Sequence, residues 1–413
     1  MAVALRWLPA VMVAGYLEFV AWNQRVTTDG PLMRYVLPAI AVAILVAFVA
    51  IRRTPPTPGL ACLALVAAAS LLIDRVQLGV GFTDLGIYLN AGRHALAGQP
   101  VYQVEPLSAM PADYTTLPYL YPPPTIPFFA ALAWLPANLG GILFVVGSVA
   151  ILVAGLRRLG VGLPWTGAIL LWPPVFSGIM SGNVSVLTAG LFFLGPWFGA
   201  GLVLAPLLKP YNAIAGLWLV REGQWRPLLV GIAIVAAVSL VTLPLVGGLD
   251  AWRAWLDGLV AFTESERRVG QLHGISPHRF GVPAIVVIGV AVTVTIVALL
   301  RRGTPGLGRL GIATIVAQPT LYLHGFIIAL PEILALRSAW LWPAVAVCSI
   351  VGRPPGLPSG LESPGPWLAV AIVLLSWAVP SRIRQATSEP VRDDEAAIRP
   401  LGRLAEPWPA SPT

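Results

Sequence analysis

Charged residues are scarce in this chain. Only 11% of its 413 residues are Asp, Glu, Lys or Arg, while 57% are hydrophobic and the mean hydropathy is +0.80. A soluble globular domain carries roughly 25% charged residues, so a water-soluble fold is excluded and most of the chain must lie in lipid. Because lipid cannot satisfy an open backbone, the composition predicts an all-α polytopic membrane protein.

Cysteine, histidine and lysine are also scarce. The two cysteines, Cys62 and Cys348, lie in separate apolar stretches without a CxxC motif, which excludes a disulfide framework and a zinc site. The chain has no Asp-X-Asp motif, so a nucleotide-sugar mechanism with a bound divalent metal has little support. We expect neither a metal nor a cofactor.

Arginine is the abundant charged residue. The net charge of +8 would also suit a nucleic-acid partner, but the basic residues lie between apolar stretches, as the positive-inside rule describes. The pairs Arg52-Arg53, Arg157-Arg158 and Arg301-Arg302 all face the cytoplasm in one topology. That topology has roughly 11 to 13 membrane segments. They include the apolar stretches at about 5–20, 35–51, 60–73, 163–180 and 340–351. Residues 125–136 and 200–220 are expected to be partial or re-entrant helices, the second broken at Leu208-Lys209-Pro210.

The expected organisation is one transmembrane domain, residues 1–380, with outer loops at 74–124 and 248–280. The tail, residues 381–413, is polar and proline-rich, and we expect it to be cytoplasmic and disordered.

The first outer loop carries the most informative motifs. Asp84 follows a membrane span at the start of a helical pattern, and the element Tyr121-Pro122-Pro123 ends the loop. Asp84 is one well-placed carboxylate, a candidate for acid–base chemistry, but an ordinary helix N-cap is the alternative interpretation.

Four elements together resemble glycosyltransferase family 87 over roughly residues 74–324. They are, in order, the stretch 84–102, Tyr121-Pro122-Pro123, the turn Ser181-Gly182-Asn183 and the break Leu208-Lys209-Pro210. The resemblance implies a GT-C type transmembrane helix bundle that uses a polyprenyl-phosphate sugar, either mannose or arabinofuranose. The turn departs from the family, in which Gly-Gln-X is more common.

The resemblance implies that Asp84 is the general base for the acceptor hydroxyl. The chemistry is compatible, since a polyprenyl phosphate leaves as a stable anion and needs no acid, whereas glycoside hydrolysis uses two carboxylates.

A departing phosphate needs cationic partners. Lys209 is the only lysine and lies at a proline break, so it is a candidate for donor phosphate binding, with a snorkelling structural lysine as the alternative. His324 resembles the family's late polar position, and a neutral interfacial histidine is its alternative role. Arg279 is a further candidate phosphate contact.

Candidate substrate contacts are Tyr88, Tyr102, Tyr121, Asn183 and His278. The mixed charges around His278 and Arg279 are more typical of a solvated surface, which is the alternative role of this segment. Trp252 and Trp255 fit interfacial anchors as well as sugar-stacking residues.

The sequence thus favours a hexosyltransferase that moves mannose from polyprenyl-phosphate mannose to a hydroxyl of a glycolipid or polysaccharide, with inversion. The site is expected on the outer, periplasmic face of a bacterial plasma membrane. An arabinofuranosyltransferase is the nearest alternative. A membrane transporter is the alternative from another class, but transporters place ionisable groups near the bilayer midplane.

Overall fold

The computed structural model describes residues 82–102, 104–105, 118–136, 139–170, 172–269, 276–277, 281–336, 344 and 365–378. This part of the chain is helical and contains no strand, which confirms the all-α prediction for the described residues. The spans expected before residue 82, most of the span expected at 340–351, and the tail from residue 381 lie outside the described residues.

The described residues form a series of α-helices and short 3-10 helices. In chain order they are α4 (Thr83–Leu96), η3 (Pro123–Thr125), α5 (Ile126–Trp134), α6 (Leu139–Arg158), α7 (Leu163–Leu170), α8 (Pro173–Ser181), α9 (Val184–Phe193), α10 (Ala200–Leu208), η4 (Pro210–Asn212), α11 (Ala213–Arg221), α12 (Trp225–Thr242), η5 (Leu243–Val246), α13 (Leu249–Val269), α14 (Ala284–Leu299), α15 (Gly303–Ala317), η7 (Leu323–Ala329), α16 (Leu330–Ala335) and α18 (Gly365–Ala378).

Two helices of the described part are long and apolar enough to cross a membrane, α6 and the continuous run Trp225–Val246. At 1.5 Å per residue, the 20 residues of α6 extend about 30 Å, the thickness of a hydrocarbon core. Only 11% of the apolar window in Trp225–Val246 is buried, so most of its hydrophobic side chains face outward. Other apolar helices, such as α14, are shorter.

Prolines divide several of the expected segments. The break predicted within 200–220 is confirmed, because α10 ends at Leu208, Lys209 is extended and Pro210 begins η4. Proline disfavours the helical conformation of the residue before it, and Lys209, which precedes Pro210, is accordingly extended. The single segment predicted from Leu163 to Met180 is wrong, since Pro173-Pro174 starts a new helix, α8, after α7 has ended.

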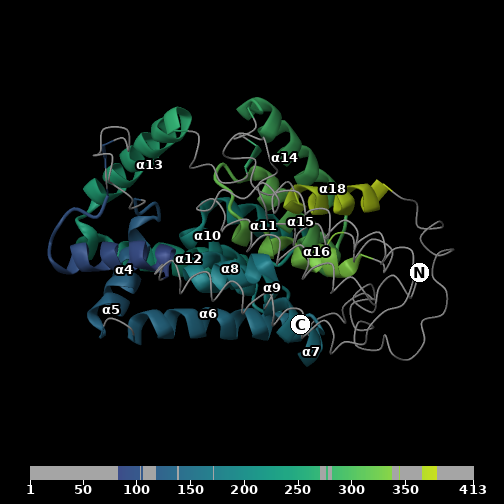
Figure 1. Cartoon of the computed structure of the whole chain (residues 1–413), viewed down its shortest axis with the longest axis horizontal. Coiled ribbons are helices and arrows are strands. Elements are labelled where there is room, and N and C mark those ends of the chain that lie inside the picture. The colour runs from purple at the N-terminus through teal and green to yellow at the C-terminus, as the bar shows by residue number, and fades with distance from the viewer. Residues whose placement is uncertain are drawn as a thin grey trace, which may run out of the picture.

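The expected outer loop at 248–280 is also more ordered than a solvated loop. It contains α13, a helix of 21 residues. Trp255 of α13 donates an indole N–H bond of 3.0 Å to the carbonyl oxygen of Leu120, beside the Tyr-Pro-Pro element. Figure 1 shows α13 at the same end of the molecule as α4 and α5.

α6 extends from the part of the molecule that contains α4 and α5 to the part that contains α7. Its Leu139 end lies near α4 and α5, whereas its other end carries Arg157 and Arg158 and leads into α7 (Figure 1). α4 packs against α5, and α6 packs against α9. Leu85, the neighbour of Asp84, approaches Gly141 in the first turn of α6, so Asp84 lies towards the end of α6 opposite the arginine pair.

A glycine fixes the packing of α4 on α5. A Cβ added to Gly92 would lie 2.5 Å from the carbonyl oxygen of Phe129, a backbone atom that cannot turn away, whereas a Cβ on Gly86 of the same helix would meet nothing within 4 Å. We expect Gly92→Ala to destabilise the protein by about 1–3 kcal/mol through overpacking. Gly86→Ala should be neutral or stabilising by about 0.5–1 kcal/mol. Thermal unfolding in detergent measures both, and equal unfolding temperatures would contradict the close contact.

Candidate active site

Asp84 lies in the first turn of α4 and is half-buried. The helix has Phe82 at its N-cap and no side-chain capping bond, so the interpretation of Asp84 as an N-cap is wrong. Its carboxylate oxygen Oδ2 instead accepts a hydrogen bond of 2.8 Å from Nδ2 of Asn183, which lies 99 residues later in the chain. The contact joins α4 to the turn between α8 and α9.

Asn183 is held by the turn between α8 and α9. Gly182 ends α8 in the left-handed conformation, with φ +65°, and Asn183 is the N-cap of α9. Its Oδ1 accepts a bond of 2.8 Å from the backbone N–H of Ser185. Because Oδ1 is occupied by a donor, the amide has a fixed orientation and Nδ2 must face the Asp84 carboxylate.

Lys209 approaches the same helix end. It lies between α10 and η4, outside the two helices long enough to span, and its Nζ donates a bond of 2.5 Å to Oγ of Ser185. Burial lowers the pKa of Lys209 to about 8, while the charge of Asp84 acts in the opposite direction. The amine is therefore mostly protonated at neutral pH, and its ring neighbour is Tyr211 at 5.9 Å.

His324 completes the group of charged and polar side chains. It is 7% exposed in η7, and its ring stacks on Tyr322 with centroids 5.8 Å apart. Both Lys209 and Asp84 interact with it electrostatically. Three of the residues predicted from the sequence, Asp84, Lys209 and His324, thus lie in one neighbourhood.

The predicted tyrosines form a cluster beside Asp84. The hydroxyl groups of Tyr88 and Tyr121 are 2.9 Å apart, and the hydroxyl of Tyr102 donates to the backbone oxygen of Tyr121 at 2.8 Å. Burial raises the pKa of Tyr88 and of Tyr121 well above the usual value, and the charge of Asp84 raises both further. Both phenols therefore stay protonated and can donate hydrogen bonds at neutral pH.

Sequence reasoning missed two contacts. Ser185 links Lys209 to the cap of α9, and Trp255 of α13 holds the segment before Tyr121. A search for a hydroxyl one or two residues after a capping Asn would have found Ser185. The other two predicted site residues, His278 and Arg279, lie outside the described residues, so their positions stay predictions.

Two buried side-chain amides lie next to this cluster, and each has one polar atom without a hydrogen-bond partner. They are Nδ2 of Asn212, three residues after Lys209, and Oε1 of Gln318, which lies 3.1 Å from the position of a Cβ on Gly325, next to His324. Buried polar atoms are nearly always paired in folded proteins, so these two are available to a polar ligand. The described residues contain no group of three or more His, Cys, Asp or Glu able to hold a metal ion.

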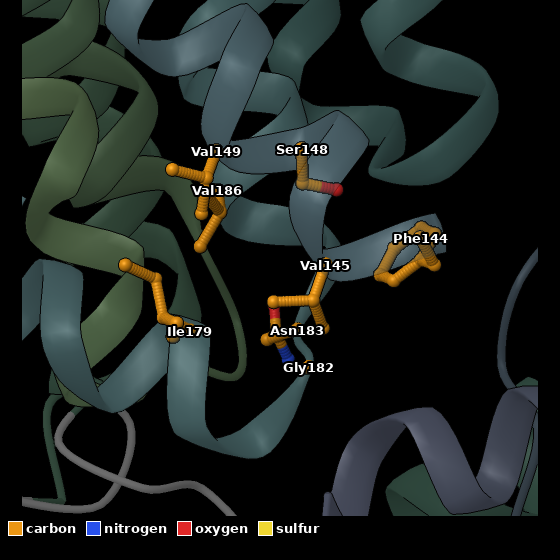
Figure 2. A pocket seen from close by; sticks show the side chains of 9 residues that line it. Phe144, Val145, Ser148, Val149, Ile179, Gly182, Asn183 and Val186 are labelled. Carbon is orange, nitrogen blue, oxygen red and sulfur yellow. The ribbon is translucent and has the colours of Figure 1, made fainter. Parts of the chain in front are cut away.

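An apolar groove leads away from Asn183. It runs between α6 and α8 beside α9 and is too narrow to admit a water molecule in this conformation; it is lined by Phe144, Val145, Ser148, Val149, Gly178, Ile179, Gly182, Asn183 and Val186. Figure 2 shows Asn183 and Gly182 at one end of this groove and Val149 and Val186 towards the other. The groove therefore joins the polar cluster to the flank of a membrane-length helix.

The sequence model of glycosyltransferase family 87 matches residues 119–319, which confirms the resemblance seen in the motifs. The chain is a hexosyltransferase. A polyprenol-phosphate-mannose-dependent alpha-(1-2)-phosphatidylinositol pentamannoside mannosyltransferase of Mycolicibacterium smegmatis is 25% identical over 323 residues, 67% of this chain and 77% of that protein.

A second relative has a related activity. The polyprenol-phosphate-mannose-dependent alpha-(1-2)-phosphatidylinositol mannoside mannosyltransferase of Mycobacterium tuberculosis is 24% identical over 314 residues, 65% of this hexosyltransferase and 70% of that protein. No solved structure matches the chain. The matched family region includes Asn183, Ser185 and Lys209, whereas Asp84 and His324 lie outside it.

Because the hexosyltransferase has a single lysine, the charge state of the site can be measured directly. Protein labelled with 13C at the lysine ε carbon should give one side-chain NMR signal, titrating near pH 8. Asp84→Asn removes the negative charge that favours the ammonium, so the pKa of Lys209 should fall further. A pKa that is unchanged by Asp84→Asn would show that the two groups do not interact.

Proposed function

We propose that this hexosyltransferase moves mannose from polyprenyl-phosphate mannose to a hydroxyl of a glycolipid or polysaccharide acceptor, with inversion at the anomeric carbon. One observation carries the proposal. Asp84 is hydrogen-bonded to Asn183 and Lys209 is hydrogen-bonded to Ser185, two residues further along the chain, so the carboxylate and the cation lie in one site. Both relatives are named as mannosyltransferases that depend on polyprenol-phosphate mannose and act on phosphatidylinositol mannosides.

In this mechanism Asp84 takes the proton from the acceptor hydroxyl as its oxygen attacks the anomeric carbon. The bond between that carbon and the phosphate oxygen breaks, and the polyprenyl phosphate leaves as an anion. Lys209 stabilises the departing phosphate, and His324 contributes a hydrogen bond to it. No acid is required, which agrees with Asp84 as the one carboxylate of this cluster among the described residues.

The buried polar groups around the cluster suit a sugar. The phenols of Tyr88 and Tyr121 lie near Asp84 and can hold the acceptor. The unpaired amide atoms of Asn212 and Gln318 offer one donor and one acceptor to the hydroxyls of the donor sugar. Such paired recognition discriminates between sugars, because a missing hydroxyl leaves a buried polar group unsatisfied.

We assign the groove between α6 and α8 to the hydrocarbon chain of the donor, which requires the two helices to separate when the donor binds. In polyprenyl-phosphate mannose the chain begins one phosphate away from the reacting carbon. In a glycolipid acceptor, sugars separate the reacting hydroxyl from the acyl chains. A groove that starts at Asn183, which contacts Asp84, therefore fits the donor. Each methylene buried there contributes about 0.8 kcal/mol to binding.

The proposed orientation follows from α6. Arg157 and Arg158 end this helix on the side away from Asp84, and positively charged ends of membrane helices face the cytoplasm. The site then opens on the outer face of a bacterial plasma membrane, where a polyprenyl-phosphate donor and a glycolipid acceptor meet in one bilayer.

The function is tested by incubating the purified protein in chelator with radiolabelled polyprenyl-phosphate mannose and membrane glycolipids. We expect transfer by the wild type and a loss of about 10²- to 10⁴-fold in kcat for Asp84→Asn, the range for removing a general base. Asp250→Asn is the matched control, since that carboxylate is 86% exposed and pairs with Arg253.

The proposal is contradicted if Asp84→Asn transfers mannose as fast as the wild type. Transfer from the arabinofuranose donor but not from the mannose donor would change the sugar and keep the mechanism. If the wild type transfers sugar from neither donor, the proposed function is wrong.

The groove assignment predicts a dependence on chain length. Val149→Trp places a larger side chain in the groove and should raise KM for a long-chain donor about tenfold. This corresponds to the binding energy of about two buried methylene groups. It should change KM for a short-chain donor much less. Val146→Trp is the control, because Val146 lies on the same helix but is 59% exposed and does not line the groove. Equal effects of Val149→Trp on both donors would refute the assignment.

A further inference from the structure

Asp84 and Lys209, both half-buried, interact electrostatically but do not form an ion pair within the described residues. Opposite charges attract more strongly at a partly buried position than in bulk water, so a carboxylate and an ammonium free to move there would pair directly. Each is instead bonded to a neutral group. Asp84 accepts from the Asn183 amide, and Lys209 donates to the Ser185 hydroxyl.

We propose that Asn183 and Ser185 act as a spacer that holds the carboxylate of Asp84 and the ammonium of Lys209 apart. Both are positioning residues and act through those two side chains rather than on the substrate. The inference rests on the proposed function and deepens it, because it assigns a role to Ser185 and reassigns Asn183 from substrate contact to support.

The spacer is rigid because it belongs to the first turn of α9. Asn183 and Ser185 are 6% and 4% exposed, and the bond from the Ser185 N–H to Asn183 Oδ1 links them directly. The preceding Gly182 presses on α4, since a Cβ there would lie 2.6 Å from Cβ of Leu85, the neighbour of Asp84. The spacing of the two charges is therefore set by helix geometry and packing.

The spacing has a chemical purpose. A carboxylate that is paired with an ammonium is a weaker base, because the pair lowers its pKa. An ammonium that is paired with a carboxylate binds a phosphate less well. In an inverting transfer the acceptor and the leaving phosphate lie on opposite sides of the sugar. The base and the cation must then stand apart to contact both. The other polar groups facing them are Tyr88, Tyr121, Tyr211 and His324.

The first test measures transfer by Ser185→Ala and by Asn183→Ser, which keeps a side chain able to cap α9. We expect each to lose at least about tenfold in kcat, because two groups that act together are misplaced. Ser185→Thr, which retains the hydroxyl, should recover activity. Thr188→Val is the matched control, since Thr188 is a buried hydroxyl of the same helix that bonds only to a backbone oxygen.

A double substitution separates positioning from a general structural effect. In the background Lys209→Met, Ser185→Ala should cause little further loss, because Ser185 acts through the lysine. Independent losses that multiply would overturn the role assigned to Ser185. Wild-type kcat in Ser185→Ala would do the same.

The second test needs no activity and so separates this inference from the proposed function. In Ser185→Ala the ε-13C signal of the single lysine should report a raised pKa of Lys209, since Nζ turns toward Asp84. Asp84→Asn combined with Ser185→Ala should abolish that rise. A lowered or unchanged pKa in Ser185→Ala would contradict the spacer. If Ser185→Ala shows the rise but the wild type transfers no sugar, the proposed function alone is contradicted.

Discussion

The hydrogen bond between Asn183 and Asp84 joins parts of the chain that are 99 residues apart, and the candidate site depends on it. α4 packs mainly against α5, and its buried side chains belong to a cluster rich in aromatic residues. The turn between α8 and α9 brings the bundle against it, through Gly182 on Leu85 and Asn183 on Asp84. Without this contact the carboxylate would belong to a peripheral helix and have no cation near it.

The second constraint is the cost of placing charge in an apolar protein. A lysine in the centre of a membrane helix costs roughly 2.5–3.5 kcal/mol, and Lys209 avoids that position because Pro210 ends the helix before it. The extended backbone at Lys209 directs its Nζ to Ser185, where a hydroxyl replaces water as its partner. The break at Pro210, which is visible in the sequence, therefore allows Lys209 to lie near the carboxylate of Asp84.

The sequence predicted the residues with unusual chemistry better than the residues that support them. Asp84, Lys209 and His324 were identifiable because a charge near lipid needs a reason, and the structure brings all three together. Ser185 was not, since a serine among apolar residues has many ordinary roles and its partner is 24 residues away.

Helix ends were predicted unevenly for a physical reason. Pro210 marked its break clearly because a lysine accompanies it, whereas Pro173-Pro174 lies in a continuous apolar run, and hydrophobicity alone suggested one helix in place of α7 and α8. Asp84 was compatible with an N-cap in the sequence. Only the position of Phe82 at the cap and the contact with Asn183 decide against that role.

The most direct test of the account is an experimental structure of Asp84→Asn with polyprenyl-phosphate mannose bound. The account predicts the donor phosphate at Nζ of Lys209, the anomeric carbon facing residue 84, and the hydrocarbon chain between α6 and α8. A donor bound with its phosphate away from Lys209 and its sugar away from residue 84 would contradict the proposed mechanism.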